Sequence, residues 1–61
     1  MKRKEALRQI TEYIEHPDGT TTIEFKWTKR LARFVRTALR AQRVSKERVA
    51  EHLRDLMRDA S

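Results

Sequence analysis

The sequence contains no cysteine, and it has only one glycine and one proline. The absence of cysteine excludes disulfide bonds and thiolate metal sites as stabilising cross-links, and the isolated His16 and His52 predict no metal site or cofactor. A single glycine excludes a glycine-rich loop that cradles phosphate, and no nucleophile has a suitable base beside it, so we do not expect an enzyme. No apolar run approaches the about 18 residues that a membrane-spanning helix needs. We therefore expect a soluble, cytoplasmic protein without a membrane partner.

The chain is short and highly charged. Its 61 residues, of which 38% are hydrophobic and 39% charged, predict one small domain. A chain of this length buries only about 60% of its unfolded surface, so we expect a thin core and a marginally stable single copy. Close packing or association with a second copy is expected to supply the missing stability.

The excess positive charge lies in one segment. The net charge is +6, and residues 29–44 alone contain six cations and no acid. On a helical wheel, five of these cations fall within about 80° of one another, opposite an apolar face that begins at Leu31. They are Lys29, Arg33, Arg36, Arg40 and Arg43. The segment is therefore predicted to form an amphipathic helix with a continuous basic stripe.

Two interpretations of this basic stripe remain open. Most charge runs are solvated faces, but solvated faces usually mix signs, because like charges at i,i+4 repel and opposite charges attract. Residues 45–61 mix them, with four cations and four acids, whereas residues 29–44 do not. The contrast favours contact with an anion, either nucleic-acid phosphate or an acidic protein.

The segment TTTIEFKWT, residues 20–28, alternates apolar and polar side chains as a β-strand does. A lone strand leaves its backbone N–H and C=O groups without partners. The partner is either a second copy of the same strand or residues 10–16, which precede the turn sequence Pro17-Asp18-Gly19.

The hairpin alternative has two disadvantages. In a regular register Glu12 lies opposite Glu24, and like charges across a strand pair repel each other. The same register turns Ile10 and Ile14 to the polar side. A helix over about residues 4–15 agrees better with the many helix-forming residues there, so we favour a second copy as the partner of the strand.

Two helices are predicted after the strand. Thr28 is the expected N-cap of the basic helix, and Ser45 is that of a second helix with Glu47 in its first turn. The break between them is expected at about Gln42 to Val44. The apolar faces contain Leu31, Phe34, Val35, Ala38 and Leu39 in the first helix and Val49, Ala50, Leu53, Leu56, Met57 and Ala60 in the second.

The segment that starts TIEFKWTKRLARF at residue 22 and continues through VSKERVAEHLRDLM to about residue 58 resembles a known family. It is similar to the ribbon-helix-helix DNA-binding domain of Arc-, CopG- and MetJ-type repressors, with a strand, a capped helix, a turn and a second helix. The fold class implied is mainly α with one short β-strand, a ribbon-helix-helix homodimer with an extra N-terminal helix. Residues 1–20 would form that helix and a turn, and residues 21–61 the ribbon-helix-helix domain.

The resemblance implies a sequence-specific transcriptional repressor, with an antitoxin as one such role, that binds double-stranded DNA. Two copies of the strand would pair antiparallel and enter the major groove. The residues contacting bases would be Thr22, Glu24 and Lys26, and those contacting phosphate would be Arg43, Ser45, Lys46, Lys2 and Arg3. The dimer core would hold Ile23, Phe25, Trp27, Leu31, Val35, Val49 and Leu53. The basic stripe, and not the resemblance, indicates a second anion-binding surface that would hold Lys29, Arg33, Arg36 and Arg40.

Three features depart from this family. Arg43 stands where the turn usually has glycine, Glu24 is a carboxylate at a base-reading position, where the nearby phosphates repel it, and the first 20 residues have no counterpart. Two other folds therefore stay open: an αββαα arrangement, and a helix-turn-helix with a β-hairpin wing in which residues 45–48 enter the groove. The alternative function is a small basic module that docks an acidic protein through residues 29–43.

Overall fold

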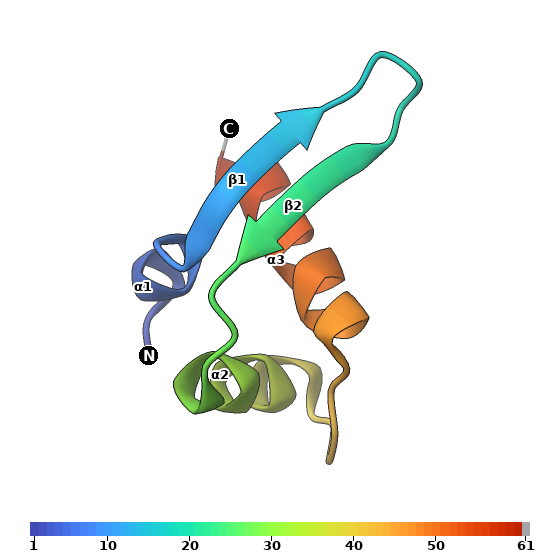
Figure 1. The fold of residues 1–61 in the computed structure, drawn as a ribbon. Coiled ribbons are helices and arrows are strands. Elements are labelled where there is room, and N and C mark those ends of the chain that lie inside the picture. The colour runs from blue at the N-terminus through green and yellow to red at the C-terminus, as the bar shows by residue number, and fades with distance from the viewer. Residues whose placement is uncertain (61) are drawn as a thin grey trace.

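The computed structural model describes residues 1–60. It contains a β-hairpin and three helices: the hairpin lies across α3, and α2 closes one end of the molecule (Figure 1). In chain order the elements are α1 (Arg3–Leu7), β1 (Ile10–Glu15), β2 (Thr21–Phe25), α2 (Lys29–Leu39) and α3 (Lys46–Ala60). Each helix in this part of the chain is too short or too polar to cross a bilayer.

The predicted fold with one strand is wrong, because β1 and β2 pair antiparallel within one chain. The N-terminal helix ends at Leu7, and residues predicted to continue it form β1 instead. The predicted ribbon between two subunits is wrong for the same reason. β1 of the same chain supplies the backbone partners that we expected β2 to find in a second copy. The observed order of one helix, two strands and two helices is that of the alternative αββαα arrangement.

A β-bulge in β1 removes one disadvantage of the hairpin. The register sets Tyr13 opposite Ile23 and then shifts between Ile10 and Glu12, so that Ile10 and not Thr11 lies opposite Phe25. A bulge inserts one unpaired residue and restores the alternation beyond it. Ile10 therefore packs against the buried core.

The repulsion between Glu12 and Glu24 is present but small. The two residues lie opposite each other in the register, and both are exposed to solvent. Such pairs change stability by only about 0.2–1 kcal/mol, and water and salt screen the charges further. A penalty of this size does not outweigh the packing of the inward face of the hairpin against α3.

The turn of the hairpin is closed by its own polar groups. The N–H of Gly19 donates to the carbonyl of His16 at 3.1 Å, and Gly19 has a φ of 90°, which glycine adopts without strain. The Asp18 carboxylate accepts from the Thr20 hydroxyl at 2.6 Å and from the Thr20 N–H at 2.9 Å. These two hydrogen bonds, the hydroxyl first, lower the pKa of Asp18. The turn is thus specified locally by the sequence around Pro17.

Five apolar side chains are fully buried, and together they come from all three helices: Ala6, Leu31, Val35, Val49 and Leu53. The hairpin adds Ile10, Ile23 and Phe25, which are half-buried against them. Six of the seven side chains predicted for a dimer core therefore pack within one chain. The seventh, Trp27, has 49% of its surface exposed.

Helix α2 ends in a left-handed residue that is not glycine. Arg40 has a φ of 53°, the one positive value among the non-glycine residues of the described chain. The N–H of Ala41 donates to the carbonyl of Arg36 at 3.0 Å, as in a Schellman motif. This conformation costs a residue with a Cβ about 1–2 kcal/mol. The left-handed residue of this turn is thus Arg40 and not Arg43, which stands at the place of the family's glycine.

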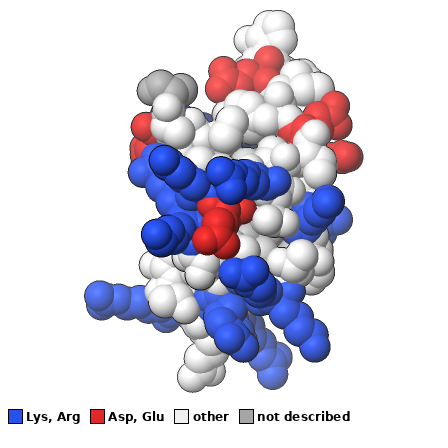
Figure 2. Space-filling view, turned by 90° about the vertical axis from the view of Figure 1, so that its left-hand side faces the viewer, with Lys and Arg blue, Asp and Glu red and all other residues white. Residues whose placement is uncertain are grey.

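Charge is distributed unevenly along the molecule, which is 34 Å long and 19 Å across. In the space-filling view, carboxylates gather at the end with the hairpin turn, whereas Lys and Arg side chains cover the half that contains α2 (Figure 2). The positive charge on this face is therefore concentrated at the α2 end.

Candidate functional site

One hollow at the α2 end combines several cations with an exposed aromatic ring. It has a volume of about 630 Å³ and lies between the start of α2 and the connection to α3. Its lining includes Trp27, Lys29, Arg33, Arg36 and Arg43, and none of its lining residues is acidic. We call this hollow, as lined by these five residues, the cationic hollow.

Helical spacing places three of these cations on one side of α2. Lys29, Arg33 and Arg36 follow one another at i, i+4 and i+7, and all three are exposed, whereas Leu31 on the opposite side is fully buried. The connection between α2 and α3 then brings Arg43 to the same hollow. Four positive charges that are separate in the sequence thus surround one space.

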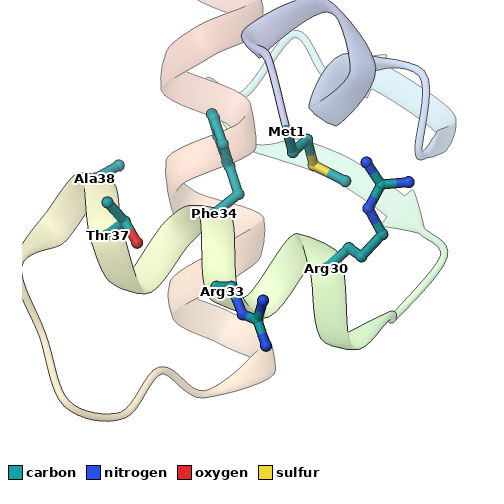
Figure 3. A pocket seen from close by; sticks show the side chains of 6 residues that line it. All are labelled: Met1, Arg30, Arg33, Phe34, Thr37 and Ala38. Carbon is teal, nitrogen blue, oxygen red and sulfur yellow. The ribbon is translucent and has the colours of Figure 1, made fainter.

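Arg33 also borders a second hollow beside the first, which is lined mostly by apolar groups (Figure 3). Its volume is about 370 Å³, and Met1 and Phe34 line it. The ring of Phe34 points toward α3 and lies 6.2 Å, centroid to centroid, from the ring of His52. An apolar surface therefore adjoins the cationic hollow.

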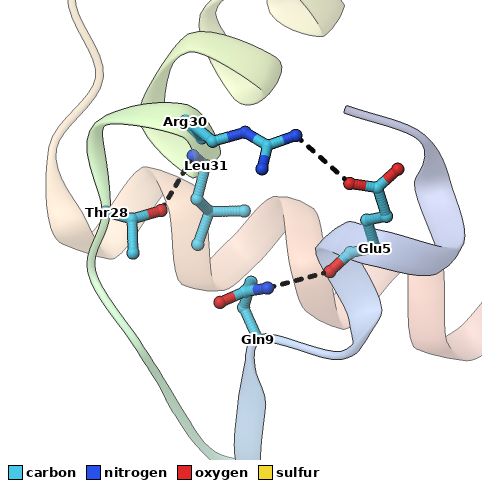
Figure 4. A network of polar contacts seen from close by, with 5 residues as sticks. All are labelled: Glu5, Gln9, Thr28, Arg30 and Leu31. Carbon is cyan, nitrogen blue, oxygen red and sulfur yellow. Dashed lines mark hydrogen bonds and ion pairs between the residues drawn. The ribbon is translucent and has the colours of Figure 1, made fainter.

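Two polar contacts fix the start of α2 (Figure 4). The hydroxyl oxygen of Thr28 accepts a hydrogen bond from the N–H of Leu31 at 3.1 Å, which confirms Thr28 as the N-cap. The Arg30 guanidinium donates to the Glu5 carboxylate at 3.3 Å and so ties α2 to α1. Next to it, the side-chain amide of Gln9 donates to the backbone carbonyl of Glu5 at 3.2 Å, a contact within the N-terminal segment. The beginning of the row of cations is therefore held in place.

The cations of the cationic hollow have no carboxylate partners in residues 1–60. The salt bridges in this part of the chain join Arg30 to Glu5 at 3.3 Å and Arg48 to Glu51 at 3.7 Å. The first turn of α2 contains no acidic residue either. Like charges at helical spacing repel each other by a few tenths of a kcal/mol per pair, about 0.2–0.5. A bound anion would remove that cost, so the hollow is a candidate site for an anionic ligand.

The sequence predicts Trp27 as a core residue, because the alternation of apolar and polar side chains continues through it. The strand in fact ends at Phe25, whose ring centroid lies 6.2 Å from that of Trp27 with the planes tilted by 56°. Helix α2 begins at Lys29, so Trp27 is held between two regular elements and half of its surface faces solvent. The N-cap Thr28 is the sequence signal that could have indicated the exposure of Trp27. The chain must leave the strand before it reaches the cap, so the strand alternation need not extend to the residue just before Thr28.

The three residues predicted to contact bases lie outside the cationic hollow. Thr22 places its hydroxyl oxygen 2.6 Å from Nε2 of His16. Glu24 lies opposite Glu12, so this face of the hairpin presents two neighbouring carboxylates. Lys26 is exposed just beyond the end of β2. The outer face of the hairpin would therefore repel phosphate rather than attract it.

Of the residues predicted to contact phosphate, Arg43 alone lines the cationic hollow. Ser45 is confirmed as the N-cap of α3, because its hydroxyl oxygen accepts from the N–H of Arg48 at 3.2 Å. Lys46 begins α3 and borders a separate hollow together with Glu24. A carboxylate thus lies in the surroundings of Lys46 but not in those of Arg43.

The remaining predicted cations also lie apart from the hollow. The Arg3 guanidinium donates to the carbonyl of Leu56 at 3.4 Å and joins α1 to α3. Lys2 is exposed at the N-cap of α1, and Arg40 is exposed in the turn after α2. The structure therefore joins three members of the predicted second surface with Arg43 and separates them from the fourth member.

No family model, curated protein or solved structure matches this chain. Function must therefore be argued from the chemistry of the site. No group of three His, Asp or Glu side chains in the described residues is placed to hold a metal ion. The groups best placed to hold a ligand are the four cations and the indole ring of the cationic hollow, which suit a molecule with both negative charge and an aromatic part.

Proposed function

We propose that this protein binds nucleic acid, with the cations of the cationic hollow contacting phosphates. The observation that supports this most is the convergence of Lys29, Arg33, Arg36 and Arg43 on one hollow that no acidic residue lines. Three of the four are arginines, whose planar guanidinium groups can form two hydrogen bonds to one phosphate. Neutralising phosphates releases their bound counterions, which supplies most of the affinity of such contacts.

The arrangement of these cations suits a chain of phosphates better than a single small anion. From Lys29 to Arg36 the helix advances by about 10 Å, at about 1.5 Å per residue. Stacked nucleotides advance by about 3.4 Å each, so this row extends over about three nucleotides. The three cations of α2 are thus spread along the helix axis, and Arg43 borders the same hollow from the connection to α3.

This proposal keeps nucleic acid as the ligand but not the predicted way of binding it. The intersubunit ribbon is absent, and Glu12 and Glu24 make the outer face of the hairpin unfavourable for phosphate. The helix-turn-helix alternative is also disfavoured, because residues 40–45 separate α2 from α3 and such motifs use turns of about three to four residues. Repression of transcription, the homodimer and the cytoplasmic location stay predictions.

An acidic protein is the second candidate ligand. The same cations would attract it, and the apolar hollow at Met1 and Phe34 adjoins them through Arg33. A peptide with carboxylates and one large apolar side chain would occupy both hollows. The second candidate requires the apolar hollow and the first does not, so a loss of peptide binding in Phe34→Ala that oligonucleotide binding does not share distinguishes this candidate from the first.

The proposal is tested by fluorescence anisotropy with end-labelled 12-nucleotide DNA, single-stranded and duplex, over a series of salt concentrations. Four phosphate contacts predict a slope of log K against log salt of about −3 for the single strand. Arg36→Gln should lower affinity and reduce that slope by about 0.7, whereas Arg48→Gln, an equal change of charge on α3, should affect both much less.

Two outcomes would contradict the proposal. One is the absence of binding by either DNA at low salt. The other is an equal loss of affinity in Arg36→Gln and Arg48→Gln, which would indicate attraction by net charge and not by the site. Stronger binding of a labelled acidic peptide, weakened by Phe34→Ala, would favour the second candidate.

A further inference from the structure

We infer that Trp27 forms a stacking surface for one unpaired base, so that the preferred ligand is single-stranded nucleic acid. This inference rests on the proposed function, because the neighbouring cations must hold the backbone. If the inference is right, the ligand of the cationic hollow is a strand whose bases are accessible. A surface that contacts only the phosphates would bind a duplex equally well.

The first supporting observation is the position of the ring. Trp27 is the one tryptophan of the chain, and 49% of its surface is exposed. Its backbone position is set by its neighbours, since β2 ends at Phe25 and α2 begins at Lys29. The tilted contact with Phe25, at 6.2 Å between centroids, supports the ring from one side. A half-exposed indole that already lies against a neighbouring ring loses less freedom when a base stacks on it than a fully exposed one would.

The second observation is the composition of the hollow that this ring lines. Proteins that bind single strands combine cations that follow the backbone with aromatic side chains on which bases stack. Trp27 lines the same hollow as Lys29, Arg33, Arg36 and Arg43. The hollow of about 630 Å³ lies within the range of about 300–1,000 Å³ typical of sites for small organic ligands. A single nucleotide is of that size.

A duplex does not use this arrangement fully. Its bases are already stacked and paired, so a ring can reach a base face only after the base has been unstacked. A single strand presents base faces without that cost. Because every base has such a face, we expect only a weak sequence preference.

Charge argues against a second copy of the chain as the cover of Trp27. A two-fold contact centred on Trp27 would bring both cationic hollows, with four cations each, against one another. No carboxylate lines the hollow to offset that repulsion. A polyanion with aromatic groups satisfies both the charge and the exposed ring.

The position of Trp27 allows a direct experiment on the unmodified protein, because all of its tryptophan fluorescence, excited at the long-wavelength edge where Tyr13 does not absorb, comes from this ring. The protein is titrated at low salt with three probes: a 12-residue oligothymidylate, a blunt 12-base-pair duplex, and inorganic polyphosphate, which has charge but no bases. We expect saturable quenching of Trp27 with oligothymidylate, and protection from acrylamide in the same complex. The duplex and polyphosphate should bind with little quenching.

Variants at Trp27 give a second readout. Trp27→Leu should weaken oligothymidylate binding about tenfold and leave polyphosphate binding within about twofold, because only stacking is lost. Trp27→Phe retains an aromatic face and should recover most of the affinity. Circular dichroism checks that both variants fold, and the acrylamide measurement on the unmodified protein stands even if Trp27→Leu does not fold.

The possible failures are distinguishable. If oligothymidylate and duplex bind equally and Trp27 is not quenched, the single-strand inference is wrong while the proposed function stands. If none of the three probes binds, the proposed function is wrong as well. If sedimentation shows a dimer that protects Trp27 from acrylamide without any ligand, a second copy covers the ring and the inference is overturned.

Discussion

Ile10 lies opposite Phe25 because the register of the hairpin shifts between Ile10 and Glu12, leaving Thr11 as an extra residue in β1. Without this bulge, Thr11 would take the inward position and Ile10 would face water. The bulge is thus the feature that lets a chain with an irregular apolar pattern form a hairpin with one apolar face.

The bulge predicts different roles for two isoleucines of β1. In a strand of regular alternation both would lie on the same face of the hairpin. Ile10 packs against the core, whereas Ile14 is 43% exposed. Ile10→Ala should lower the free energy of unfolding by about 1–2 kcal/mol, and Ile14→Ala by about 0.5 kcal/mol or less. Urea unfolding followed by circular dichroism measures both. Equal losses in the two variants would show that the register is regular and the bulge absent.

The left-handed residue at the end of α2 predicts a stabilising change. Arg40→Gly removes the conformational cost at φ 53° and should stabilise the protein by about 1 kcal/mol, which corresponds to about 4–8 °C in melting temperature for a domain of this size. Because Arg40 does not line the cationic hollow, binding of oligothymidylate should fall only slightly.

The matched control for this change is Arg43→Gly. Arg43 does not have a positive φ, so glycine there relieves no strain and adds freedom to the unfolded chain. It should destabilise the protein slightly and weaken oligothymidylate binding, because Arg43 lines the hollow. Thermal melts and anisotropy test the pair. Stabilisation by Arg43→Gly and not by Arg40→Gly would place the left-handed residue where the family resemblance implied it.

The hairpin turn predicts a dependence of stability on acid. Hydrogen bonds from Thr20 lower the pKa of Asp18 from its ordinary value of 3.8. The carboxylate therefore contributes stability that is fully present above pH 3.8 and is lost as the pH falls through the lower, folded-state pKa. Thr20→Val removes the hydroxyl donor and should bring the pKa of Asp18 back toward 3.8.

Carboxyl chemical shifts in a pH titration by NMR measure this pKa directly. Thr22→Val is the control, because the hydroxyl of Thr22 contacts His16 and not Asp18. It should leave the pKa of Asp18 unchanged. An unchanged pKa in Thr20→Val would mean that the Thr20 hydroxyl does not hold the carboxylate.

Sequence reasoning succeeded where hydrogen bonds are local. Thr28 and Ser45 were identified as N-caps because each contact joins residues three apart, and both caps are observed. The pairing of β1 with β2 depends instead on a bulge at Thr11, and the alternation of apolar and polar residues in the sequence does not indicate that bulge. Trp27 was misassigned because the polar and apolar alternation continues after the strand has ended. The grouping of Arg43 with the cations of α2 depends on the path of a whole connection, which a helical wheel cannot represent.

The measurement that tests the account most directly is an amide NMR titration of the protein with oligothymidylate at low salt. The account predicts that the largest shifts lie at residues 27–36 and at Arg43, together with the indole N–H of Trp27, and that the outer face of the hairpin changes little. Shifts concentrated at Thr22, Glu24 and Lys26 would contradict it and would return the binding surface to the hairpin.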